Sequence, residues 1–176
     1  MFKRIAIFLV LLIVGILGFA ATKPDTFRVQ RSTSIKAPPD KVFALVNNFH
    51  SWDGWSPWEK MDLTMKKTYG GPDSGPGATY EWDGNDKVGK GKMEISKVAE
   101  PKEINLKLHF MKPFECQNRV DFTFENKGEA TDVTWAMHGP NPYFSKLMQV
   151  FMSMDSMVGK DFEAGLANLK AIAEKN

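Results

Sequence analysis

Short segments in which apolar and polar residues alternate constrain the fold of this chain more than any other feature. Seven such segments can be distinguished, at residues 27–35, 63–69, 78–82, 93–98, 104–110, 118–124 and 133–137. A period of two is typical of strands with one buried face, and their close succession indicates antiparallel pairing. From Pro142 to Ile172 the apolar residues recur instead at helical spacing, and about thirty helical residues would reach about 45 Å. Gly159 separates two apolar stripes, so we expect it either to kink this helix or to divide it in two. Strands beside segregated helices predict an α+β fold, in which a curved antiparallel sheet wraps a long C-terminal helix.

Two helical segments are predicted between the first and second strands. Pro38 and Pro39 end the first strand, and a helix follows through Val46 with apolar residues three and four positions apart. The next segment, residues 50–60, contains three tryptophans, one glycine and one proline. This composition indicates a short helix or an irregular segment rather than a strand.

The N-terminus carries seventeen consecutive residues without a charge, Ile5–Ala21, directly after Lys3 and Arg4. A membrane-spanning helix needs roughly 17–25 apolar residues, so the run is long enough to span. A cleaved signal peptide is the alternative, because Gly18 and Ala20 permit a cut after residue 20. We favour an uncleaved anchor, which divides the chain into an anchor at residues 1–22 and a domain at residues 23–176.

The basic residues on either side of this run bear on its orientation. Lys3 and Arg4 favour a cytoplasmic N-terminus, which would put the domain on the extracytoplasmic side, in the periplasm of a Gram-negative cell. Lys23, Arg28 and Arg31 follow the run and weaken this prediction.

Charge and residue types exclude several classes of function. Without Lys3 and Arg4 the chain has 21 basic and 21 acidic residues, so the domain lacks the positive surface that nucleic-acid binding requires. The single cysteine excludes an internal disulfide. The three histidines have no metal-ligand spacing, and no pattern of an activated nucleophile occurs. We therefore predict no metal, no cofactor and no nucleic-acid partner.

Three stretches make the chain resemble a known family. They are residues 35–60 (IKAPPDKVFALVNNFHSWDGWSPWEK), 77–95 (GATYEWDGNDKVGKGKMEI) and 157–175 (MVGKDFEAGLANLKAIAEK). Together they resemble the START-like, or SRPBCC, superfamily, in particular its bacterial polyketide cyclase/dehydrase branch, over nearly all of residues 26–175. The resemblance implies a helix-grip fold of the START/Bet v 1 type, with a cavity between sheet and helix that often holds lipids or other apolar ligands. It implies no particular reaction.

Residues expected to line this cavity are aromatic, methionine or inward-facing polar side chains. They are Trp55, Trp58, Tyr80, Trp82, Phe110, Asn118, Trp135, Met148 and Met152. Methionine adapts to varied apolar ligands, and tryptophan can stack on a ligand or shield it. Each set also has an alternative interpretation. The methionines would pack in the core, and the tryptophans would close one end of the core or contact the membrane interface. Asn118 would form its hydrogen bonds with another strand or with water.

These observations favour a membrane-anchored module that binds a lipid-like or other apolar small molecule. One alternative is an envelope protein-interaction module whose core is filled by its own side chains, with an unidentified protein partner. Another is an enzyme that uses pocket acid/base chemistry through a residue such as Asn118 or Tyr80, which the absence of a catalytic motif disfavours.

Overall fold

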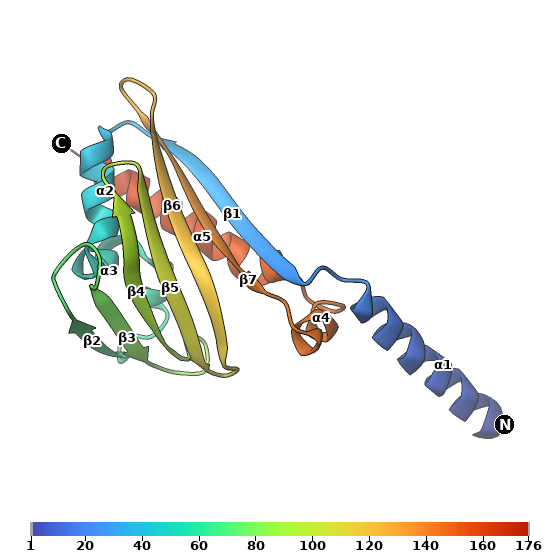
Figure 1. Cartoon of the computed structure of the whole chain (residues 1–176). Helices are drawn as coiled ribbons and strands as arrows, with labels where there is room; N and C mark the ends of the chain where they lie inside the picture. Colours follow the sequence, from blue (N-terminus) through green and yellow to red (C-terminus); the bar gives the residue numbers. More distant parts are fainter. Residues whose placement is uncertain (1, 176) are drawn as a thin grey trace.

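Seven antiparallel strands form one curved sheet that wraps a C-terminal helix (Figure 1). The computed structural model describes residues 2–175. The strands are β1 (Thr26–Ile35), β2 (Lys66–Gly70), β3 (Thr79–Asp83), β4 (Lys90–Ala99), β5 (Glu103–Lys112), β6 (Cys116–Asn126) and β7 (Thr131–Pro140). They lie in the order β1-β7-β6-β5-β4-β3-β2, so every neighbour except β1 with β7 is also the neighbour in sequence. This arrangement confirms the predicted α+β helix-grip fold.

The alternation in sequence corresponds to the two faces of the sheet. In β6 the inward residues Asn118, Val120, Phe122 and Phe124 are buried, whereas Arg119 and Thr123 between them are exposed. The same period-two burial occurs in β3, β4 and the first half of β5. The concave face therefore carries the apolar side chains that pack against the helix.

Four short helical elements follow β1 and close one side of the core. They are α2 (Pro39–Asn47), α3 (Trp52–Trp55) and, around α3, the 3-10 turns η1 (Phe49–Ser51) and η2 (Pro57–Lys60). Pro39 at the first position of α2 has the φ that a helix start requires. Trp52 and Trp55 are buried, so these two tryptophans do not contact a membrane surface.

The C-terminal helical region is divided, as one of the two expectations from sequence allowed, but the break lies at residues 149–153 and not at Gly159, which is inside the second helix. Helix α4 covers Tyr143–Met148 and helix α5 covers Met154–Ala173. Ser153 begins α5 because its hydroxyl accepts a hydrogen bond from the Ser156 backbone N–H at 3.1 Å. Buried residues of α5, including Phe162, Leu166 and Leu169, then pack on the concave face.

An apolar helix, α1 (Phe2–Ala21), precedes the domain and projects from it (Figure 1). It has the length and composition of a membrane span, although a signal sequence would share both. Most of its large apolar side chains, such as Phe8 and Val14, are more than half exposed. It contacts the domain through α4, where the Tyr143 hydroxyl donates to the Leu17 carbonyl near the end of α1.

Candidate functional site

A cluster of six aromatic rings fills the space between the sheet and α5. The rings, here called the aromatic cluster, come from α3, η2, β6, β7 and α5 and belong to Trp52, Trp55, Trp58, Phe122, Trp135 and Phe162. Trp135 lies at its centre, where it stacks on Phe122 with ring centroids 5.0 Å apart and on Phe162 at 4.2 Å. The structure thus brings the predicted residues Trp55, Trp58 and Trp135 together.

Helix α5 approaches the sheet closely at this point because Gly165 has no side chain. A Cβ atom at Gly165 would lie 2.7 Å from Cζ3 of Trp135, closer than packed carbon atoms approach. The rings of Trp135 and Phe162 are nearly parallel, with 6° between their planes. No ligand fits between these two rings, so any bound molecule lies beside the pair.

The indole nitrogen of Trp135 is the unusual polar atom of the cluster. Trp52 Nε1 donates to the Val46 carbonyl at 3.0 Å, and Trp55 Nε1 donates to the Leu45 carbonyl at 3.1 Å. Trp135 Nε1 is equally buried and has no hydrogen-bond partner within residues 2–175. A buried donor without an acceptor costs about 1–3 kcal/mol. An acceptor atom supplied by a ligand would recover this energy.

The concave face continues beyond the cluster to the end of the sheet where β5 finishes and β6 begins. Phe110 is partly exposed there, and Asn118 is 7% exposed on the same face, as its parity with Val120 and Phe122 predicts. Asn118 Nδ2 lies 3.8 Å from the sulfur of Cys116, a long contact for a buried amide. This end of the concave face, marked by Phe110 and Asn118, is called its open end because Phe110 is partly exposed there. It combines apolar side chains with one weakly satisfied amide.

Tyr80 and Trp82 form a second aromatic row on β3. Their rings stack at 5.9 Å, and Trp82 meets Phe110 edge to face at 5.8 Å. Trp82 Nε1 donates to the Val88 carbonyl at 3.0 Å, and its ring covers Gly91 on β4. This row thus joins the open end of the concave face through Phe110.

The hydroxyl of Tyr80 belongs to a buried polar network rather than to a free catalytic group. It donates to Glu59 Oε1 at 2.7 Å, and Glu59 Oε2 forms an ion pair with Lys67 Nζ. Burial and this hydrogen bond raise the pKa of Tyr80, so it stays protonated. Burial alone would lower the pKa of Lys67, but hydrogen bonds to Asp53 and Glu59 outweigh burial and raise it. The network joins η2 to β2 and β3, and it holds Glu59 in place instead of freeing it as a base.

Met148 and Met152 are not on the concave face with the other predicted residues. Met148 ends α4 and is 50% exposed, and Met152 lies in the turn before α5 and is 56% exposed. The break at residues 149–153 rotates this segment away from the sheet, which a continuous helical stripe did not predict. Neither residue belongs to the hydrophobic core.

Two hollows lie on the β2–β3 side of the molecule. One of about 260 Å³ is lined by residues that include His50, Tyr69 and Asp73, and one of about 150 Å³ by residues that include Glu81 and Lys90. No residue of α5 lines either hollow. They are thus separate from the space between the sheet and the helix.

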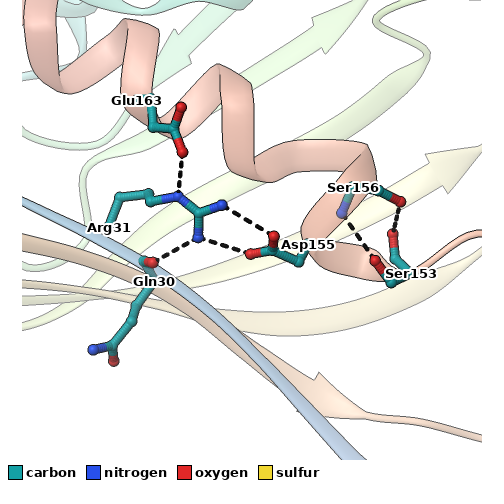
Figure 2. A network of polar contacts seen from close by, with 6 residues as sticks. All are labelled: Gln30, Arg31, Ser153, Asp155, Ser156 and Glu163. Carbon is teal, nitrogen blue, oxygen red and sulfur yellow. Dashed lines mark hydrogen bonds and ion pairs between the residues drawn. The ribbon is translucent and has the colours of Figure 1, made fainter.

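Arg31 on β1 fixes the first turns of α5, a role that the sequence analysis did not assign to it. Its Nε donates to Glu163 at 2.6 Å, and its two terminal nitrogens donate to Asp155 at 2.7 and 3.0 Å (Figure 2). Arg31 occupies the same alternating set of positions in β1 as the buried residues Val29 and Ile35. A charged residue on the inward face of a strand was therefore the sequence feature that could have revealed this role. The hydrogen bond from Arg31 holds the pKa of Asp155 below 3.8, so this contribution to stability is present above that pH and is lost as pH falls through the lowered pKa.

Replacing Arg31 with glutamine is expected to loosen the start of α5. Amide hydrogen exchange should become faster at residues 156–163, because both carboxylates lose their partner, and should stay unchanged at residues 166–173, which buried leucines hold. Hydrogen exchange measured by mass spectrometry checks this result.

Arg28→Gln is the matched control. Arg28 lies on the same strand but faces outward, and its guanidinium Nε donates only to the side chain of Gln30 within the described chain. Faster exchange at residues 156–163 in this control, or its absence in Arg31→Gln, would contradict the assigned role.

The comparisons with known proteins agree with this architecture. Residues 26–174 match the family described as polyketide cyclase / dehydrase and lipid transport. No curated protein matches the chain.

Solved structures with the same fold come from several sources. Major latex-like protein 151 of Panax ginseng has a TM-score of 0.62 at 16% identity, covering 86% of this chain and 100% of its own. A protein from Chromobacterium violaceum has a TM-score of 0.60 at 14% identity, covering 88% of this chain and 100% of its own.

A third likeness is to the di-domain ARO/CYC BexL of the BE-7585A biosynthetic pathway. It has a TM-score of 0.64 at 15% identity and covers 91% of this chain but 54% of that protein, so the chain corresponds to about half of it. These identities establish the shared fold alone. The family match covers most of the chain, and this protein is therefore a member of the polyketide cyclase / dehydrase and lipid transport family.

Proposed function

We propose that the chain is a membrane-anchored module that binds a lipid-like or other apolar small molecule between its sheet and α5. The observation that carries the proposal is the buried N–H of Trp135, which has no acceptor within residues 2–175 and lies among apolar rings. A ligand that bears one acceptor atom on an apolar body fits this environment. The lipid-transport description of the family supports the same class of ligand.

Entry to this position requires Trp58 to move. Trp58 lies in the single turn of η2, is partly exposed, and meets both Trp135 and Phe162 edge to face at 5.6 and 6.2 Å. A ligand that takes the place of this ring would contact Trp135 directly and keep the buried surface apolar. Each Å² of apolar surface that it buries would contribute roughly 25 cal/mol.

The open end of the concave face would receive the rest of an elongated ligand whose acceptor atom meets the Trp135 N–H. Asn118 offers a weakly satisfied amide there, and Phe110 offers partly exposed apolar surface. Four strand termini lie at this end of the sheet, namely the ends of β5 and β7 and the starts of β1 and β6. Helices α1 and α4 extend from the same end (Figure 1). The proposed binding face therefore opens toward the anchor, where a lipid would arrive.

Native mass spectrometry of residues 23–176, purified without detergent, tests this proposal. This portion contains all of residues 26–174, the region that matches the family, which makes it a suitable sample. We expect a discrete extra mass of a few hundred daltons, or uptake of added oleate at one site per chain. A bare polypeptide mass that also takes up neither oleate nor phospholipid would contradict it.

A filled-core interaction module is the second candidate, and one observation favours it. Trp135 stacks on Phe162 at 4.2 Å and Trp58 covers the pair, so the described side chains already occupy the centre of the domain. A bare mass combined with cross-linking to a discrete envelope protein would establish this alternative.

A further inference from the structure

A group of exposed apolar side chains gathers beside the end of α1, although the most exposed one outside that helix, Leu63, lies elsewhere, between η2 and β2. The grouped side chains belong to α4, to the turn after it and to the β5–β6 turn, and together they are called the apolar shoulder. Its members are Phe114, Tyr143, Phe144, Met148, Phe151 and Met152, with exposed fractions between 48% and 75%. Phe114 and Phe144 contact each other with ring centroids 5.7 Å apart, which joins the two segments into one surface. Contiguous apolar surface of this kind marks an interaction site.

We propose that the apolar shoulder docks on the lipid interface beside α1, as a second membrane contact of the domain. The inference rests on α1 being the membrane anchor of the proposed function. The apolar shoulder would contact the boundary between the headgroups and the acyl chains of the bilayer that α1 crosses.

The contact between α4 and α1 sets the depth of the shoulder. Tyr143 Oη donates to the Leu17 carbonyl at 2.9 Å, and Leu17 lies four residues before the end of α1, about 6 Å along a helix axis. Lys23 follows the span, with its ammonium 5.0 Å from the ring centre of Phe19. Tyrosine and lysine at this level are typical of residues at a membrane boundary. The shoulder thus lies where α1 leaves the bilayer.

The charge pattern of the shoulder also fits a lipid surface. Lys146 is the sole charged residue between positions 143 and 152. Its side chain is 10% exposed and its ammonium lies 2.6 Å from Asp25, so the charge is turned inward and paired. The outward side chains between positions 143 and 152 are therefore uncharged, which suits burial in the interface. Charged side chains that stay exposed, Asp25 and Glu115, lie beside the shoulder.

Accessibility of nitroxide labels in the full chain tests the proposal. In a Cys116→Ser background, single labels would be placed by Phe151→Cys on the shoulder, by Ile13→Cys in α1 and by Lys127→Cys in the β6–β7 turn. Phe151 is 75% exposed and Ile13 is 55% exposed, so neither label disturbs packing. The protein would be reconstituted in vesicles of phosphatidylcholine and phosphatidylglycerol. The relaxation of each nitroxide by oxygen, which concentrates in lipid, would then be compared with its relaxation by a water-soluble nickel chelate.

We expect the ratio of oxygen to nickel accessibility at position 151 to exceed that at position 127 and to approach that at position 13. If the ratio at position 151 equals that at position 127, the docking proposal is wrong. A lipid-like ratio at position 13 would in that case still support α1 as the membrane anchor. Protection of position 151 from both reagents would also overturn the docking proposal, in favour of a protein partner or second copy. A water-like ratio at 13 would refute the anchor and the docking surface together.

Discussion

Phe162→Ala is expected to lower the free energy of unfolding by about 3–5 kcal/mol, the largest effect of any single substitution considered for this protein. Phe162 is 2% exposed, stacks on Trp135 and meets Trp58, so its removal leaves a cavity at the centre of the aromatic cluster. Because Gly165 already brings α5 as close as Trp135 allows, the helix cannot move in to close the cavity. Urea denaturation of residues 23–176 measures the effect.

Phe144→Ala is the matched control, with the same change of side chain on the apolar shoulder. Phe144 is 56% exposed, so in water its replacement should change stability by about 0.5 kcal/mol or less. Equal losses in the two variants would contradict the division into a packed cluster and an exposed shoulder.

Trp135→Phe is expected to weaken binding of an acceptor-bearing apolar ligand such as oleate by roughly tenfold, which corresponds to about 1.4 kcal/mol. The variant keeps an aromatic ring in the cluster but loses the N–H proposed to meet the ligand. Because that N–H has no partner within residues 2–175 when no ligand is bound, its loss removes no hydrogen bond from the described domain. Titration calorimetry of residues 23–176 checks the affinity.

Trp55→Phe separates this effect from a general loss of packing. Trp55 has the same side chain in the same cluster, but its N–H is bonded to the Leu45 carbonyl, so the variant should cost about 0.5–1.5 kcal/mol more stability than Trp135→Phe. Ligand affinity should remain closer to that of the unchanged domain. If both variants lose affinity equally, or if Trp135→Phe binds normally, the role of the Trp135 N–H is refuted.

The sheet could be predicted from sequence because its register depends on a pattern that is visible residue by residue. Alternation along β6 and β7 predicts that Asn118 and Trp135 lie on the buried face, and the structure confirms both positions. Helix α5 followed from the spacing of Phe162, Leu166 and Leu169. Family resemblance then supplied the way in which sheet and helix pack together.

The positions that escaped prediction depend on contacts between distant segments. Apolar spacing continues through residues 149–153, so it did not reveal that Ser153 begins a new helix and that Met148 and Met152 turn outward. The role of Glu59 could not be predicted from the sequence, because its partners Tyr80 and Lys67 lie on β3 and β2. Periodicity identifies which face of an element is buried, but not which distant side chain completes a polar network.

The most direct test of the account is the indole N–H spectrum of residues 23–176 with and without oleate. The chain has five tryptophans, and the N–H groups of Trp52, Trp55 and Trp82 are already bonded to backbone carbonyls. We predict that the Trp135 proton moves downfield when oleate binds, because its N–H gains an acceptor, while those three signals keep their positions. Oleate bound with no change in the Trp135 signal would contradict binding between the sheet and α5.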